Sequence, residues 1–203
     1  MKWKQLWTDV IVINLPERTD RFARTDSDLA SFNVNYKLWK ATKDDNGIKG
    51  LCLSMKALLS WILTTDIQHF IVLEDDCNWK MDFNDFLNIL ADQVPLDYDL
   101  LYLGCNLTSQ PERYSENLLR ISTSYCTQAI AYNRKIVETI LADLDRIEPY
   151  DIKLMKIVQS RGRCYCTYPM FCEQYGGYSD IENKDMDWAM YQRITYNSYT
   201  KGI

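Results

Sequence analysis

Short apolar runs alternate along this chain with segments whose apolar residues recur every three or four positions, and this alternation restricts the fold class. The first run, Asp9–Asn14, closes before Pro16 and is apolar on both faces, as expected for a strand buried on both sides. Similar runs predict further strands at 34–39, 68–73, 99–103, 125–132 and 164–168. Strands separated by helices form mostly parallel sheets, because a parallel connection needs a crossover.

The segments between these runs predict helices. Residues 17–32 carry apolar side chains at roughly helical spacing, and Ser54 is a candidate N-cap for a second helix. Asp82 and Asn133 are candidate N-caps for two more helices, and a shorter helix is expected to begin near Asp151. We therefore expect an α/β fold with a mostly parallel central sheet and helices on both faces.

The composition fits one globular domain. Of 203 residues, 47% are hydrophobic, which is enough for a continuous core at this length. No change of composition divides the chain, so residues 1–203 are predicted to form a single domain. The formal net charge of -5 and the lack of a basic stripe argue against nucleic acid as a partner.

The sequence also predicts a cellular location. No apolar run reaches the ~18 residues of a membrane span, and the first residues do not resemble a signal peptide. The seven cysteines lack the spacing of a zinc site and are interpreted as reduced thiols. We therefore expect a cytoplasmic protein without a transmembrane segment.

Three consecutive carboxylates, Glu74, Asp75 and Asp76, follow the predicted strand at 68–73. Neighbouring carboxylates repel one another unless a cation or solvent compensates them, and oxygen ligands suit Mg²⁺ or Mn²⁺. Residues two apart face the same way in extended backbone, so Glu74 and Asp76 are expected to converge while Asp75 points elsewhere. The alternative is a solvated acidic turn.

A second polar cluster follows the first strand. Arg18 and Arg21 are three residues apart, so at the start of a helix they lie on one face. Arginine forks and a helix N-terminus both bind phosphate oxygens. The alternative is an ordinary helix surface, on which Asp20 and Asp26 form ion pairs with the arginines. In an open sheet of this kind both polar clusters are expected at the strand ends that face one crevice.

Taken together, these segments resemble glycosyltransferase family 25, which includes lipopolysaccharide-modifying and collagen galactosyltransferases. The resemblance rests on residue type and order over roughly residues 9–181. The matching segments are Asn14-Leu15-x-x-Arg18-x-x-Arg21, Cys52-x-Ser54, Leu73-Glu74-Asp75-Asp76, Asp99-Leu100-Leu101-Tyr102-Leu103-Gly104 and Thr127-x-Ala129-x-Ala131-Tyr132.

The resemblance implies a GT-A-type fold, a UDP-sugar donor with galactose or glucose, Mn²⁺ or Mg²⁺, and inversion at the anomeric carbon. The acceptor would be a hydroxyl of a glycan, a lipopolysaccharide or a protein. Glu74 and Asp76 would hold the metal, and Asp180, in a segment similar to a late family segment, could join them. The implied donor-binding residues are Asn14, Leu15, Arg18, Arg21, Ser54 and Asp75.

One position departs from the family pattern. The family usually has a histidine after the serine that Ser54 matches, and this chain has Met55. Inverting transfer needs a general base for the acceptor hydroxyl. The only histidine, His69, falls inside a predicted strand, so a carboxylate is expected in that role. Asp151 is the candidate base, with a plain helix N-cap as its alternative interpretation.

Two rival functions use the same residues. A metal-dependent phosphohydrolase or nucleotidyltransferase could employ the acidic triplet, although two-metal chemistry would need a second carboxylate cluster. A non-catalytic module that binds a nucleotide sugar or a carbohydrate is the other rival, because a fold does not guarantee activity.

Overall fold

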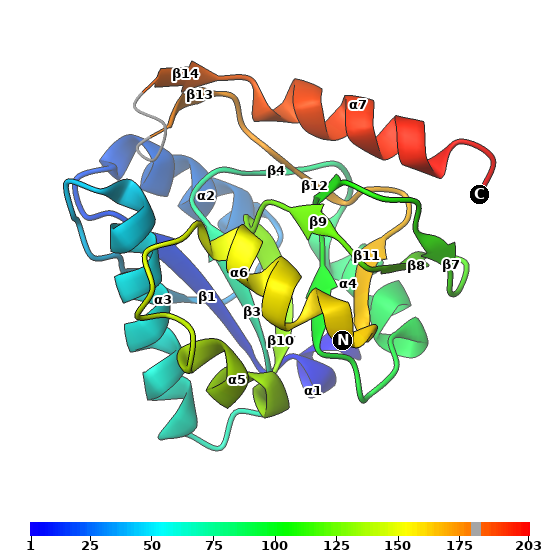
Figure 1. Cartoon of the computed structure of the whole chain (residues 1–203), viewed down its shortest axis with the longest axis horizontal. Coiled ribbons are helices and arrows are strands. Elements are labelled where there is room, and N and C mark those ends of the chain that lie inside the picture. Colours follow the sequence, from blue (N-terminus) through cyan, green and yellow to red (C-terminus); the bar gives the residue numbers. More distant parts are fainter. Residues whose placement is uncertain (180–183) are drawn as a thin grey trace.

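The computed structural model describes residues 1–179 and 184–203, and its central feature is one sheet between two sets of helices (Figure 1). In the described residues this sheet has eight strands in the order β2-β1-β3-β10-β5-β11-β8-β7. The strands are β1 (Asp9–Asn14), β2 (Lys37–Lys40), β3 (His69–Glu74), β5 (Leu100–Tyr102), β7 (Glu112–Arg113), β8 (Leu118–Ile121), β10 (Ala129–Asn133) and β11 (Cys164–Thr167).

Most strands of this sheet run in one direction. β1 pairs in parallel with both β2 and β3, and β5 pairs in parallel with β11. β10 lies antiparallel between β3 and β5, and β8 lies antiparallel to β11 and to β7. The predicted α/β fold with a mostly parallel sheet is confirmed, with β10 and β8 as the reversed strands.

Helices cover both faces of the sheet. They are α1 (Trp3–Leu6), α2 (Thr19–Ser31), α3 (Gly47–Leu63), α4 (Phe83–Gln93), α5 (Val137–Leu141), α6 (Tyr150–Ile157) and α7 (Trp188–Thr200), with 3-10 turns η1 (Arg134–Ile136) and η2 (Gln159–Arg161). Side chains alternate along each strand: Leu100 and Tyr102 of β5 join a core with α3, α5 and α6, whereas Leu101 joins a core with α1, α2 and α4.

Sequence patterns predicted several element boundaries correctly. β1 spans the predicted residues. The side chain of Asp82 caps α4 by accepting a hydrogen bond from Asp85 N, as predicted. The Asn133 side chain likewise accepts from Lys135 N at the start of the helical segment η1–α5. The second strand is shorter and later than predicted, because only Lys37–Lys40 reaches β1.

The prediction that Ser54 is an N-cap is wrong. α3 begins seven residues earlier, at Gly47, where the Asn46 side chain accepts a hydrogen bond from Lys49 N. Ser54 lies inside α3, and its hydroxyl donates to Gly50 O at 2.7 Å. Asn46 competes better for the cap because it stands in extended backbone just outside the first turn.

The C-terminal segment, for which the sequence predicted no element, forms strands and a helix. β12 (Cys172–Gln174) pairs antiparallel with β4 (Cys77–Trp79), and β13 (Gly177–Ser179) pairs with β14 (Lys184–Met186). A further pair joins β6 (Asn106–Leu107) to β9 (Ser124–Tyr125). α7 then crosses the molecule and packs on β6 and β12 (Figure 1). None of the helices described in 1–179 and 184–203 combines the length and apolar character of a membrane span.

Candidate functional site

The two polar clusters predicted from sequence meet at one edge of the sheet. β1 and β3 are parallel neighbours with Ile13 opposite Glu74, so the chain leaves both strands at the same place. Asn14 donates from Nδ2 to Asp75 Oδ2 at 2.7 Å, and Arg21 donates from NH1 to Asp75 Oδ1 at 3.1 Å. The expectation that both clusters face one region is therefore confirmed.

Asp75 is turned toward α2. Both oxygens of its buried carboxylate are occupied by Asn14 and Arg21, and its backbone carbonyl accepts hydrogen bonds from Thr25 at 3.2 Å and Arg24 at 3.3 Å. Asp75 and Asp76 lie in the turn between β3 and β4 rather than in extended backbone, and the partners of the Asp75 carboxylate differ from those of its two neighbours. Its contacts fix the start of α2 against the end of β3.

Glu74 and Asp76 have different partners. Glu74 Oε1 accepts a hydrogen bond from Thr127 Oγ1 at 2.6 Å, and Asp76 Oδ2 accepts one from Gln174 Nε2 at 3.0 Å. Burial, and then the charge of Asp76, raise the pKa of Glu74 to about 8. Burial, and then the charge of Asp75, raise the pKa of Asp76 to about 6. The site therefore concentrates negative charge that favours a proton or a cation.

Glu74 and Asp76 are the carboxylates of this site that could hold a divalent cation. Asp76 Oδ1 is buried and has no hydrogen-bond partner among the described residues, so an acceptor remains for a ligand. Within residues 1–179 and 184–203, no group of three or more His, Cys, Asp or Glu side chains is arranged to hold a metal. Mg²⁺ and Mn²⁺ are commonly held by one or two carboxylates and complete their shells with water and substrate phosphates.

Asp151 lies in the first turn of α6, next to the acidic motif. Its carboxylate accepts hydrogen bonds from Ile152 N at 2.8 Å and from Cys126 N at 3.3 Å. Burial and the charges of Asp76 and Asp75 raise the pKa of Glu74, and the charge of Asp151 adds the smallest contribution. The N-cap of α6 is Pro149, and the alternative interpretation of Asp151 as an N-cap is wrong.

Cys126 holds Asp151 from an unusual backbone conformation. Its φ of 72° lies in the left-handed region, which non-glycine residues adopt rarely. In this conformation the Cys126 N–H is directed at the Asp151 carboxylate. Left-handed residues concentrate at sites whose geometry the surrounding structure fixes.

Other predicted donor residues have structural partners. The Ser54 hydroxyl, besides bonding Gly50, accepts from Thr42 N at 2.7 Å, so it ties the loop before α3 to the helix. Leu15 O accepts from Arg18 N at 2.9 Å in a turn, and Arg18 pairs with Asp20 at 3.2 Å.

Two further positions bear on the family pattern. Met55, where the family usually has histidine, is 2% exposed and packs in the core with α5 and α6. Asp180, a predicted metal ligand, lies outside the described residues.

Sequence reasoning missed several residues of this site. Arg24 stacks on the Tyr175 ring, with 3.8 Å between the guanidinium carbon and the ring centroid, and bonds the Asp75 carbonyl. Its position three residues after Arg21 was the available signal. Thr127 and Gln174, which bond Glu74 and Asp76, offered no comparable pattern.

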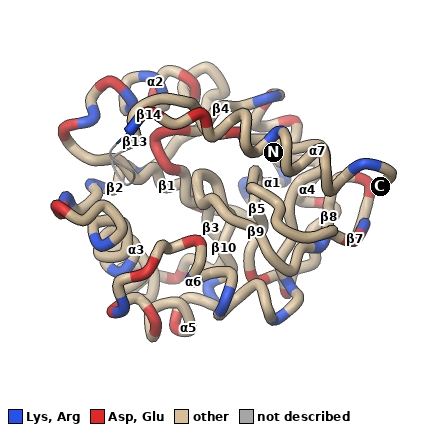
Figure 2. Tube along the Cα trace, turned by 45° about the horizontal axis from the view of Figure 1, so that its top comes forward, with Lys and Arg blue, Asp and Glu red and all other residues tan. Residues whose placement is uncertain are grey.

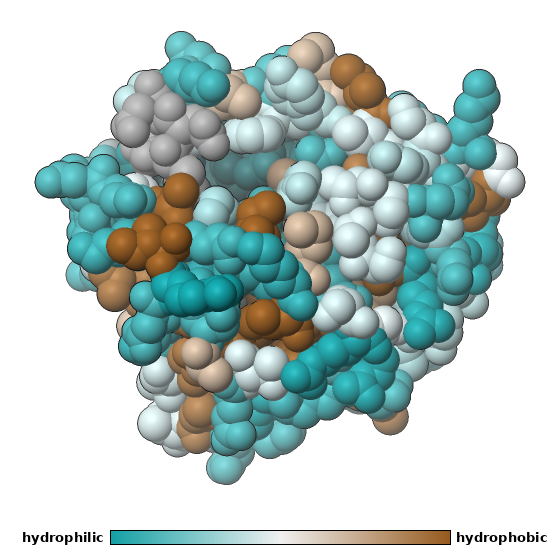
Figure 3. All heavy atoms as spheres, in the orientation of Figure 1, coloured by the Kyte–Doolittle hydropathy of each residue, from teal (hydrophilic) through white to brown (hydrophobic). Residues whose placement is uncertain are grey.

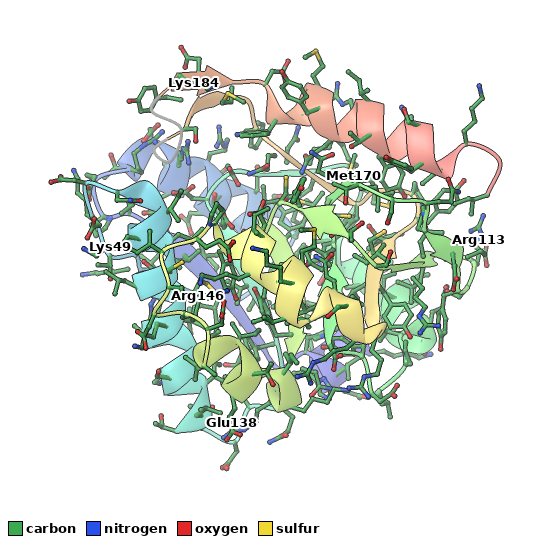
Figure 4. All side chains as sticks on the ribbon, in the orientation of Figure 1. Lys49, Arg113, Glu138, Arg146, Met170 and Lys184 are labelled. Atoms are coloured by element: carbon green, nitrogen blue, oxygen red, sulfur yellow. The ribbon has the colours of Figure 1, made fainter. Side chains whose placement is uncertain are left out.

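Charge and shape distinguish this edge of the molecule. Acidic residues follow the chain where it leaves β3 toward β4, with basic residues of α2 nearby (Figure 2). The space-filling view shows a recess in this part of the molecule (Figure 3). Lys49 on α3 and Lys184 on β14 lie toward the outer surface of the molecule in this view (Figure 4). Arg21 also bonds the Tyr178 carbonyl of β13, so the C-terminal hairpin contacts the site directly.

Comparison with known proteins shows a similarity in fold and no match in sequence. No protein-family model matches the sequence, and no curated protein matches it. A197 from STIV is similar in structure, with a TM-score of 0.53 and 11% identity over 88% of this chain and 93% of A197. This likeness shows a shared fold.

Two more solved structures are similar at lower scores. A glycosyltransferase involved in the glycosylation of the major capsid of PBCV-1 has a TM-score of 0.49 and 10% identity, over 86% of this chain and 95% of that one. Mannose-1-phosphate geranyltransferase from Thermus thermophilus has a TM-score of 0.40 and 10% identity, over 77% of this chain and 58% of that one.

Proposed function

We propose that this protein is a metal-dependent glycosyltransferase of the GT-A type, similar to family 25. It would transfer galactose or glucose from a UDP-sugar to a hydroxyl of a glycan, a lipopolysaccharide or a protein, with inversion. The observation that carries the proposal is the acidic motif at the end of β3, with a buried, unpartnered Asp76 oxygen and with Asn14 and Arg21 attached to Asp75.

The roles follow from position. Asp76 and Glu74 would hold Mn²⁺ or Mg²⁺, and the cation would stabilise the departing diphosphate as a Lewis acid. Asp75, which bonds Arg21 and Arg24, would orient these arginines of α2 for the nucleotide. Asp151, held by Cys126 N–H, would accept the proton of the acceptor hydroxyl.

Thermal unfolding with nucleotide and metal tests the proposal. UDP at about 100 times its dissociation constant, with Mn²⁺, should add about 2.7 kcal/mol to the free energy of unfolding, or roughly 5–10 °C in Tm. Excess chelator should abolish the shift. Asp76→Asn should abolish the Mn²⁺-dependent part, because the neutral amide is a poor ligand for a hard cation.

The outcomes separate the candidate functions. A further shift with UDP-galactose or UDP-glucose identifies the donor for turnover assays. Donor binding without turnover on any acceptor would favour the non-catalytic module. Absence of any shift with UDP and Mn²⁺, or an unchanged shift in Asp76→Asn, would contradict the proposed donor and metal site.

A further inference from the structure

Two consecutive residues of the C-terminal helix α7 form hydrogen bonds with the strand β12, which lies next to the acidic motif. Gln192 of α7 is fully buried, and its Oε1 accepts a hydrogen bond from Gln174 N at 2.8 Å. Arg193 follows it and forms two hydrogen bonds, of 2.8 Å and 2.7 Å, with the carboxylate of Glu173. Two adjacent residues of β12 are therefore fixed by two adjacent residues of α7.

The strand β12 in turn fixes Asp76. β12 pairs with β4, which begins directly after Asp76, so that Gln174 lies opposite Cys77. Tyr175 N donates to the Asp76 carbonyl at 2.7 Å, and the Gln174 side chain donates to Asp76 Oδ2 at 3.0 Å. Asp76 is thus held through both its backbone and its side chain by one short stretch of the C-terminal segment.

These contacts divide the two oxygens of the Asp76 carboxylate. Oδ2 is occupied by the Gln174 amide, whereas Oδ1 is buried without a partner among the described residues. A carboxylate rotates about χ2 unless one oxygen is fixed, because that torsion is broad. The Gln174 amide therefore sets which oxygen of Asp76 remains for a ligand.

We infer that Gln174 is a positioning residue that orients Asp76 for a divalent cation, and that Gln192 acts on the same carboxylate through Gln174. The inference rests on the proposed function, in which Asp76 holds the metal. Outer partners of a ligating carboxylate fix its orientation, and their loss typically lowers metal affinity about 10–100-fold.

Titration with Mn²⁺, alone and with UDP, tests the inference when free Mn²⁺ is followed by electron paramagnetic resonance. Gln174→Met keeps the length of the side chain and removes the amide, and it should weaken Mn²⁺ binding about 10–100-fold. Gln192→Met should weaken it less. The double variant should match Gln174→Met, because a residue that acts through Gln174 has no further effect once that amide is lost.

A matched control is Gln93→Met. Gln93 is also partly buried and also fixes a loop, through hydrogen bonds to its Oε1 from Ser115 and from Asn117 N, but it lies away from the acidic motif. The Mn²⁺ affinity of the Gln93→Met variant should equal that of the unchanged protein. Tm without metal reports folding, and Gln174→Asn, whose shorter amide no longer reaches Asp76, serves as a second variant with the same expected loss.

Enzyme kinetics add a readout that a purely structural defect would not give. Gln174→Met should raise the Mn²⁺ concentration needed for half-maximal turnover, while kcat at saturating Mn²⁺ stays near that of the unchanged protein. Folded Gln174 variants with unchanged Mn²⁺ affinity would overturn the inference and leave the proposed function intact. Failure of the unchanged protein to bind Mn²⁺ in either titration would overturn both.

Discussion

Three adjacent carboxylates in this protein have three different environments. Both carboxylate oxygens of Asp75 accept hydrogen bonds, from Asn14 and Arg21. Glu74 accepts one from Thr127. Asp76 has one buried oxygen without a partner among the described residues. Glu74 ends β3, whereas Asp75 and Asp76 lie in the turn that follows, and each of the three side chains has its own hydrogen-bond partners. Removal of a single carboxylate should therefore have an effect that depends on its position and not only on its charge.

Asp151→Asn should separate proton transfer from binding. The amide preserves the size of the side chain but is not a base, so turnover should fall by about 10²–10⁴-fold. Affinity for UDP with Mn²⁺ should change little, because the Asp151 carboxylate bonds Cys126 N and Ile152 N and its charge is the smallest of the causes that raise the pKa of Glu74.

The matched control is Asp145→Asn, a largely exposed carboxylate that pairs with Lys56 away from the site. Steady-state kinetics alongside a UDP titration makes the comparison. Turnover of Asp151→Asn within a few-fold of the control would remove Asp151 from the role of general base.

The candidate site was partly predictable residue by residue. The acidic triplet and the arginines of α2 are compact in sequence, so their chemistry is visible without the fold. Gln174 and Gln192 are not, because glutamine has no distinctive spacing and Gln174 meets Asp76 across 98 residues. Ser54 was misinterpreted because its role, joining Thr42 to α3, depends on a loop whose path sequence does not reveal.

At the scale of elements, α7 shows why the C-terminal segment escaped prediction. Its buried side chains are Gln192, Tyr196 and Thr200, so it lacks the apolar stripe that identifies a helix packed on a core. It is held largely by polar contacts, including Tyr196 to the Thr167 carbonyl at 2.8 Å. By contrast, α4 has a capping aspartate and a regular apolar face, and it was predicted from both.

The ion pairs of Glu173 make the attachment of α7 dependent on pH. Burial alone would raise the pKa of Glu173, but hydrogen bonds from Arg193 and Lys80 outweigh it and lower the pKa below the ordinary 4.5. Because the folded-state pKa is the lower one, this stabilisation is present above the ordinary value and is lost as pH falls through the folded value.

Arg193→Met should therefore lower stability near neutral pH, because the buried Glu173 carboxylate loses two of its charged hydrogen bonds. The deficit should shrink as pH falls below 4.5, where Glu173 becomes protonated in both proteins. Urea unfolding across pH provides the measurement. Arg146→Met is the control, since Arg146 is 63% exposed and pairs with Asp143 in the turn between α5 and α6. A deficit that stays constant with pH would contradict the ion-pair explanation.

For the whole molecule, the sequence predicted the fold class. It did not predict which strands of the sheet run in the opposite direction. Periodicity identified the strands that contain long apolar runs, and helices between them indicated a mostly parallel sheet. β10 has the same fully buried character as β1, so its sequence does not distinguish an antiparallel from a parallel neighbour. Its direction follows from the path of the chain between residues 104 and 124, where the sequence pattern predicted no strand.

The two hydrophobic cores pack on opposite faces of the same sheet. The protein should therefore unfold in a single cooperative transition. Leu100 faces the α3 side and Leu101 the opposite side, and both are fully buried. Leu100→Ala and Leu101→Ala should each cost about 2–5 kcal/mol and lower the midpoint of the same single transition. Calorimetry tests this, with Leu96→Ala, at a largely exposed leucine, as the control. Two separate transitions would contradict the predicted single domain.

The attachment of α7 to β12 also affects the order in which the site can form during synthesis. A ribosome releases Asn14 and the acidic triplet early, but Gln174 and Gln192 only much later. Until then the nascent chain presents crowded carboxylates without the strand that orients Asp76. A polypeptide interrupted before β12 therefore contains all eight strands of the described central sheet but lacks Gln174 and Gln192, the residues that act on Asp76.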